Sequence, residues 1–357
     1  MRRFLLIVLA VLAVLAAGAA LTAWSWTRTA HGPMDLGPAV MLRLSPLPAS
    51  GDFSPERRRT VNASVREMMP TAGPGVTIRD AEYPGPAGPL PLRIYAPEAA
   101  TQNTDAKAPL PIVVFIHGGG WWMGDDLEIW DGQCAKMARS VPALVVSVGY
   151  RMAPENPFPA ALDDSYAALS WIHAHARELG GDPRRIALHG ASAGGNLVAA
   201  MTLRARDEGS PATRFQVLMV PATNLAPPPS PSMRLFSEGF GLDGIEAMVQ
   251  AYLGESGDPR HPLVSPLLAP DHSRLPPALI LTAQFDPLRD DGEAYGARLR
   301  AAGVAAEVQR FDGTIHGFML SPDAREEAAA LTTAALKKAF ADPNWAPPYQ
   351  PLPVLLR

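Results

Sequence analysis

Short runs of apolar, often β-branched residues recur along most of the chain, and longer amphipathic stretches separate them. Within one such stretch, apolar residues repeat at the three-to-four-residue spacing of a single buried helix face, which predicts a helix over 160–177. Short buried strands that alternate with helices predict a parallel sheet covered on both faces. The predicted strands of this sheet are 112–116, 143–148, 184–189, 215–220, 278–284 and 306–311.

Two parts of the chain depart from this alternation. Upstream, a helix is predicted at 54–70, with Ser54 as its N-cap and Pro70 as its stop, and two strand-like segments, 75–83 and 90–97, follow it. Downstream, 222–275 combines proline-rich loops with a helix-like stretch at 243–254. We interpret 222–275 as an insertion folded over the sheet, where it forms a cap together with residues 28–75.

The amino terminus has the pattern of a membrane segment. An uncharged run from Phe4 to Ala23 follows two arginines, and as a helix its twenty residues would reach about 30 Å, enough to span a bilayer core. Trp24 and Trp26 follow where interfacial aromatic residues are expected. The length favours an uncleaved anchor, although the small residues at 17–19 keep a cleaved signal open. Either way, we expect export of the remainder: a domain at 28–340 and a proline-rich tail at 341–357.

Composition narrows the possible functions. The chain has 357 residues and a net charge of −4, and no basic run resembles a nucleic-acid footprint. The arginines at 57–59 are predicted to form a solvated helix face. The single cysteine, Cys134, excludes an intrachain disulfide and a multi-cysteine metal site. It lies in an amphipathic stretch, 131–140, and is predicted to be a buried structural thiol.

A serine surrounded by small residues separates one predicted strand from a helix. Residues 190–194 read Gly-Ala-Ser-Ala-Gly, which fits G-x-S-x-G with Ser192 as the nucleophile candidate. A nucleophile on a tight strand-to-helix turn projects its hydroxyl above the sheet, and the turn needs small neighbours. The competing interpretation is a tight turn with a helix-capping serine.

A nucleophilic serine needs a base, and the base needs an acid to orient it. In this type of sheet the chain order is serine, acid, histidine. Of eight histidines, five precede Ser192 and two lie in the predicted insertion, which leaves His316. Asp286 follows a predicted strand and is favoured as the acid over Asp312, which is only four residues from His316.

Three consecutive glycines follow the strand at 112–116, in "IHGGGWW". Glycine lets a backbone approach a ligand closely and aim N–H groups at it, as in the oxyanion holes of lipases and esterases. A phosphate-binding loop is the alternative for such a run, but no Lys-Ser/Thr pair follows it.

Together these elements resemble the hormone-sensitive lipase family of α/β-hydrolase esterases, also called bacterial family IV. The resemblance covers about 75–340 and rests on "HGGGW" at 117–121, "YRMAPENPFPAALDD" at 150–164, "GASAGGN" at 190–196, "DPLRD" at 286–290 and "HGF" at 316–318. One departure is Ala191, where the family usually has Asp or Thr. The resemblance implies an α/β-hydrolase fold with a helical cap and no metal or cofactor. The implied site residues are Ser192, Asp286 and His316 as the catalytic triad, with the backbone N–H groups of Gly119, Gly120 and Ala193 as the oxyanion hole.

The expected reaction is hydrolysis of short- to medium-chain carboxylic esters, small-molecule substrates, through an acyl-enzyme. Trp121 and Trp122 are predicted to line the apolar mouth of the site, or else to pack against the cap. The same triad would also serve an amidase, a deacetylase or a lactonase. A non-catalytic ligand-binding protein of the same fold is a further alternative, which the presence of His316 disfavours.

Overall fold

The computed structural model describes residues 2–44, 51–98, 108–318 and 321–342. Its centre is an eight-stranded sheet in the order β10-β9-β8-β7-β5-β6-β4-β3. The strands from β10 to β6 are parallel, and β4 and β3 extend the sheet in antiparallel fashion. The strands are β3 (Val76–Gly85), β4 (Gly88–Pro97), β5 (Leu110–Ile116), β6 (Leu144–Val148), β7 (Gly181–Ala191), β8 (Phe215–Met219), β9 (Ala278–Phe285) and β10 (Ala306–Ile315).

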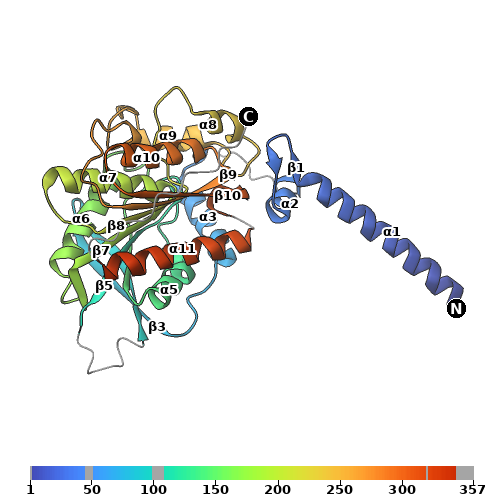
Figure 1. Ribbon diagram of the computed structural model, residues 1–357, viewed down its shortest axis with the longest axis horizontal. Coiled ribbons are helices and arrows are strands. Elements are labelled where there is room, and N and C mark those ends of the chain that lie inside the picture. Colours follow the sequence, from blue (N-terminus) through green and yellow to red (C-terminus); the bar gives the residue numbers. More distant parts are fainter. Residues whose placement is uncertain (1, 45–50, 99–107, 319–320, 343–357) are drawn as a thin grey trace.

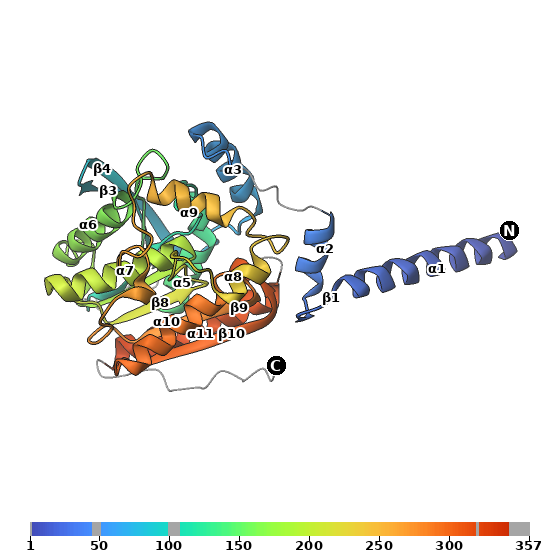
Figure 2. The ribbon, with the colours of Figure 1, turned by 90° about the horizontal axis from the view of Figure 1, so that it is seen from above.

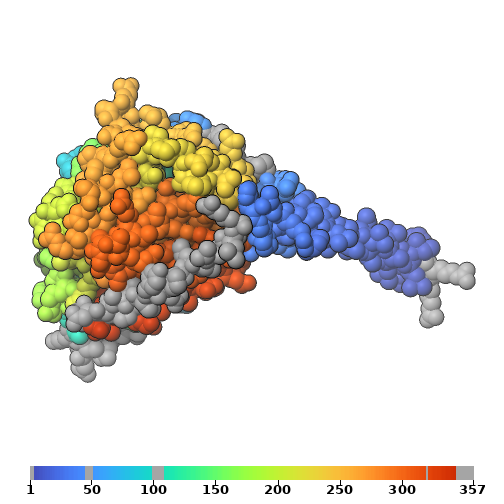
Figure 3. Space-filling view, turned by 45° about the horizontal axis from the view of Figure 1, so that its top comes forward, coloured from blue at the N-terminus to red at the C-terminus, as the bar shows by residue number. Residues whose placement is uncertain are grey.

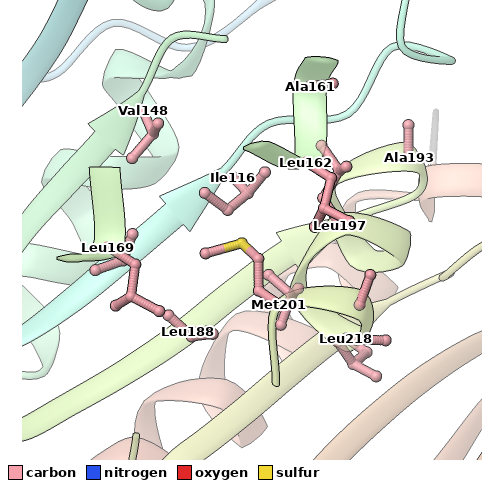
Figure 4. Packing of buried hydrophobic residues seen from close by; sticks show 14 of the residues in the cluster. Ile116, Val148, Ala161, Leu162, Leu169, Leu188, Ala193, Leu197, Met201 and Leu218 are labelled. Atoms are coloured by element: carbon pink, nitrogen blue, oxygen red, sulfur yellow. The ribbon is translucent and has the colours of Figure 1, made fainter. Parts of the chain in front are cut away.

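Helices cover both faces of the sheet, as the alternating pattern predicts (Figure 1). Along β5, Ile112, Val114 and Ile116 belong to one buried cluster, whereas Val113 and Phe115 belong to the other. The first cluster includes α6 (Ala160–Ala174), α7 (Ala193–Glu208) and α10 (Arg289–Ala301); the second includes α5 (Asp131–Ser140) and α11 (Pro322–Ala341). Figure 4 shows α6 and α7 side chains packed over Ile116 and Leu188 in the first cluster. The side chains of β5 are thus buried on both faces of the sheet, as expected for a parallel sheet with helices on both sides.

Element boundaries differ from the predicted ones at several strand and helix ends. The helix predicted at 160–177 ends at Ala174, and β7 begins at Gly181, three residues before the strand predicted at 184–189. β10 continues to Ile315, so that Asp312 lies inside the strand and not at its end, and its side chain is exposed. The helix predicted at 54–70 is α3 (Pro55–Met68), and the Ser54 side chain accepts from the N–H of Arg57, as predicted for its cap. Cys134 is buried in α5, also as predicted.

The amino-terminal helix α1 (Arg2–Trp26) extends away from the sheet (Figures 1 and 2). Its segment Phe4–Trp26 has a mean hydropathy of 3.0 and is not buried against the rest of the protein. By length and composition it is apolar enough to cross a membrane, and a signal sequence has the same features. A small hairpin, β1 (Arg28–Thr29) and β2 (Gly32–Pro33), and α2 (Leu36–Leu44) connect α1 to the rest of the chain. Helices α8 (Pro231–Phe236) and α9 (Ile245–Leu253) lie in the 222–275 segment. Of the predicted tail, 343–357 lies outside the described residues.

Candidate active site

Ser192 occupies the single residue between β7 and α7, in a conformation that non-glycine residues rarely adopt (φ 54°, ψ −117°). The glycines around it are required by close backbone contacts. A Cβ at Gly190 would lie 2.2 Å from the carbonyl oxygen of Gly194, and one at Gly194 would lie 2.1 Å from that of Ile116. The N–H of Ser192 donates to the carbonyl oxygen of Met219 at the end of β8 (2.8 Å), which fixes the turn against the next strand.

The predicted base and acid meet this serine. His316 Nε2 lies 2.9 Å from Ser192 Oγ, and His316 Nδ1 lies 2.8 Å from Asp286 Oδ2. Asp286 is fully buried, and its other carboxyl oxygen accepts from the N–H of Leu288 at 2.8 Å. The imidazole is therefore held between a buried carboxyl group and a hydroxyl. Asp312, the rival acid, is exposed within β10.

Topology explains how three distant residues converge. Ser192 follows β7, Asp286 follows β9 and His316 follows β10. These strands are parallel, so their carboxyl ends lie at one edge of the sheet, where open α/β sheets place their chemistry.

The glycine loop after β5 runs against the Ser192 turn. A Cβ at Gly118 would lie 2.8 Å from the carbonyl oxygen of Ala191 and 3.4 Å from Ser192 Cβ. Gly119 (φ 114°) and Gly120 (φ 59°) both have backbone conformations that favour glycine. Ala193 begins α7, where N–H groups of the first turn have no helical acceptor and the helix dipole favours negative charge. The predicted oxyanion donors thus belong to two segments in mutual contact.

His117 belongs to this loop but is buried away from solvent. Burial lowers the pKa of its imidazole to about 4, so the ring is neutral at physiological pH. The ring stacks on Tyr150 with centroids 4.2 Å apart, and the Tyr150 hydroxyl donates to the carbonyl oxygen of His117 at 2.9 Å. A neutral, packed imidazole is suited to shaping the loop and not to taking up a proton.

Trp121 and Trp122 are nearly buried, at 3% and 8% exposure. Trp121 stacks on Tyr252 of α9 with centroids 4.3 Å apart, and Trp122 packs edge-to-face with Phe53 with centroids 5.3 Å apart. Both partners belong to the segments predicted to form the cap. The contacts that the two tryptophans make are therefore those of the alternative prediction, packing against the cap. Their contact with substrate stays a prediction.

Two residues of α3 that were given no role at the site from the sequence hold the same loop. The Arg58 guanidinium donates to the carbonyl oxygens of Trp122 and Ala153, and its side chain is only 12% exposed. Asn62, 7% exposed, accepts from the N–H of Gly124 (2.9 Å) and donates to Asp125 Oδ1 (2.7 Å). The prediction of a solvated face at 57–59 is therefore wrong for Arg58, whose partners lie 64 and 95 residues away.

No group of three or more His, Cys, Asp or Glu side chains in the described part of the chain could hold a metal ion.

Comparison with known proteins places these features in a family. A family described by the α/β hydrolase fold matches residues 113–320, more than half of the chain. The carboxylic ester hydrolase LipN of Mycobacterium tuberculosis is 43% identical over 264 residues, 72% of this chain and 68% of that protein. The arylesterase of Saccharolobus solfataricus is 39% identical over 80% of this chain and 90% of its own length.

Solved structures agree with the sequence relatives. An arylesterase structure superposes with a TM-score of 0.78 at 36% identity, covering 86% of this chain and 99% of that one. A bacterial heroin esterase gives 0.77, also at 36% identity, over 86% and 98%. The predicted fold class is confirmed. The chain belongs to the hormone-sensitive lipase family of α/β hydrolases, as its motifs predict.

Proposed function

We propose that this protein is a serine carboxylesterase in which Ser192 is the nucleophile, His316 the general base and Asp286 the acid that orients it. The observation that carries the proposal is the continuous contact from Ser192 Oγ through the imidazole to a buried carboxyl group, with spacings of 2.9 and 2.8 Å. Relatives named carboxylic ester hydrolase, arylesterase and ethyl acetate hydrolase support esters as the substrate class.

In the proposed reaction, Ser192 Oγ attacks the ester carbonyl carbon while His316 Nε2 takes its proton. The N–H groups of Gly119, Gly120 and Ala193 stabilise the resulting oxyanion, and one such donor contributes about 10²–10³ in rate. Collapse of the tetrahedral intermediate breaks the bond to the alcohol oxygen, which receives the proton from His316. A water molecule then gives a proton to His316, attacks the acyl-enzyme and releases the acid, and Ser192 recovers its proton.

Ser192→Ala tests the nucleophile directly. We expect turnover of p-nitrophenyl acetate and butyrate to fall by at least about 10⁴-fold, because removing a triad member leaves only the oxyanion hole and binding. Ser170→Ala, an exposed serine on α6, is the matched control and should keep wild-type turnover. A fluorophosphonate probe should label the wild type at Ser192 only. Equal turnover in wild type and Ser192→Ala would refute the assignment, and absence of labelling would favour the non-catalytic alternative.

The acyl and leaving-group preferences form a finer part of the proposal. Short- to medium-chain esters fit a mouth in which α9 stands close to the glycine loop: a Cβ at Gly120 would lie 2.7 Å from Met248 Sδ. Contacts of Tyr252 with Trp121, and of Phe53 with Trp122, support residues 28–75 and 222–275 as the cap. Parallel panels of p-nitrophenyl esters, anilides and lactones would separate esterase from amidase and lactonase activity.

We also propose that α1 anchors the chain in a membrane, with the catalytic domain on the extracytoplasmic side. The exposed, apolar Phe4–Trp26 supports this, and Arg28 stacks over the Trp24 ring at 4.0 Å, near the expected interface. Carbonate extraction of membranes, followed by intact-mass measurement of the protein, separates an uncleaved anchor from a processed signal.

A further inference from the structure

The segment that follows α1 packs against the strands that carry the acid and the base. Met34 and Ala39 of this segment share a buried cluster with Phe236, Phe285 and Ile315. Phe285 immediately precedes Asp286, and Ile315 immediately precedes His316. We call residues 28–39 the N-terminal strap. Figure 2 shows α2, in which the strap ends, between α1 and the body of the protein, and in Figure 3 this blue surface meets the yellow surface near α8.

β10 does not pair regularly with β9 just before His316. Phe311 pairs with Ala283 and Ile315 pairs with Phe285, so that residues 312–314 stand opposite the single residue Gln284. Such a bulge leaves backbone groups without their ladder partners and redirects the side chains that follow it. The position of His316 therefore depends on how this bulge is held.

The side chain of Gln284 holds the bulge and joins it to the strap. Its Oε1 accepts from the N–H of Gly313 and its Nε2 donates to the carbonyl oxygen of His31, both at 2.8 Å. The N–H of Asp35 donates to the carbonyl oxygen of Gly313 at 2.8 Å. Both polar backbone groups of Gly313 are thus satisfied from outside the β9–β10 ladder, one by Gln284 and one by the strap.

Glycine is favoured at two positions of this contact, because the backbone φ is positive and a side chain would displace a neighbouring polar group. Gly313 has a φ of 77°, and a Cβ there would lie 2.6 Å from Asp35 Oδ1. Gly32 has a φ of 112°, and a Cβ there would lie 2.8 Å from Gln284 Nε2. Gln284 itself is 7% exposed, so its amide bonds are shielded from water.

We propose that Gln284 is a positioning residue for the Asp286–His316 pair and that the N-terminal strap completes this support. The inference rests on the proposed function of those two residues. Gln284 lies on β9, two residues before Asp286, and acts on the pair indirectly. Its side chain fixes the bulge in β10 that precedes His316. By this inference, the segment that joins α1 to the catalytic domain helps to hold the Asp286–His316 pair in position.

Gln284→Met keeps the side-chain length and removes both hydrogen bonds. We expect kcat for p-nitrophenyl butyrate to fall about tenfold to hundredfold, because a displacement near 1 Å of a reacting group costs up to about 10² in rate, while KM changes little. The apparent pKa in the kcat–pH profile should shift as well, since it reports the base in the substrate complex. Gln284→Glu, which keeps the acceptor for Gly313, should lose less, and it carries the test if Gln284→Met does not fold.

Gln216→Met is the matched control. Gln216 is fully buried on β8 and its Nε2 donates to the carbonyl oxygen of Pro276 (2.9 Å), but it lies near the opposite end of its strand from the triad. We expect this change to lower stability without altering kcat or the pH profile. The inference is overturned if Gln284→Met and Gln284→Glu keep wild-type kcat and pH profile, or if Gln216→Met loses as much kcat. Wild-type protein that neither turns over esters nor labels with a fluorophosphonate would instead overturn the proposed function.

Discussion

Replacing Arg58 with alanine tests whether α3 holds the glycine loop in place. The Arg58 guanidinium donates to the carbonyl oxygens of Trp122 and Ala153 and pairs with Glu155 at 2.6 Å. Arg58→Ala removes all three contacts. It leaves the two carbonyl oxygens without a charged donor in a region where Ala153 is 1% exposed and Trp122 8%.

The size of the effect follows from these contacts. A hydrogen bond from a charged group contributes about 1.5–3 kcal/mol, whereas a partly exposed ion pair contributes about 0–1 kcal/mol. The Glu155 side chain is 37% exposed, so the two carbonyl contacts dominate, and we expect a loss of about 3–6 kcal/mol in the free energy of unfolding. Because Trp122 follows Gly120 by two residues, kcat should fall about tenfold to hundredfold through misplaced oxyanion donors.

The assay compares wild type, Arg58→Ala and Arg59→Ala in p-nitrophenyl butyrate hydrolysis and in urea unfolding. Arg59 is the exposed neighbour on the same helix and should leave both quantities near wild type. The reasoning is wrong if Arg58→Ala and Arg59→Ala cannot be distinguished in either measurement. A loss of stability without a loss of kcat would show that α3 supports the fold but not the oxyanion donors.

Three further outcomes are expected. Asp286→Asn should lower kcat about 10⁴-fold while fluorophosphonate labelling of Ser192 slows in parallel, because the imidazole loses its orienting carboxylate. Burial raises the pKa of Asp291 to about 6, so its stabilising contribution is complete below pH 3.8 and is lost as pH rises through about 6. In urea unfolding, the stability of Asp291→Asn relative to wild type should therefore increase by on the order of 3 kcal/mol from pH 4 to pH 7.5. A stability difference that is the same at both pH values would contradict this reasoning. Burial also raises the pKa of the Cys134 thiol, so a disulfide reagent at pH 8 should leave the native protein unlabelled. In ~6 M guanidinium, which is well above ordinary unfolding midpoints, the same reagent should modify one thiol per chain.

The sequence predicts the fold and the three converging side chains because both depend on local signals. Apolar runs mark the strands, and the order of Ser192, Asp286 and His316 along the chain follows from where parallel strands end. Cys134 was predicted correctly for the same reason, since its amphipathic surroundings mark a buried helix face. Each of these signals can be recognised within a stretch of sequence about as long as one helix or strand.

Supporting contacts could not be predicted in the same way. Arg58 reads as one of three surface arginines, and Gln284 as one polar residue near a strand end. Gln284 meets His31 across 253 positions in the chain, a separation that no helical or strand periodicity encodes. The end of β10 was misplaced because Gly313, a residue that usually stops a strand, here belongs to a bulge inside one.

The crowding around the Ser192 turn has a consequence for anyone altering this enzyme's selectivity. Gly118, Gly190 and Gly194 face backbone oxygens within 2.8 Å of any added carbon, so no side-chain repacking can relieve a substitution there. We therefore expect most substitutions at these three positions to abolish activity. Met248 of α9, by contrast, approaches Gly120 through the end of a flexible side chain, so variation at this position is the better place to seek altered selectivity.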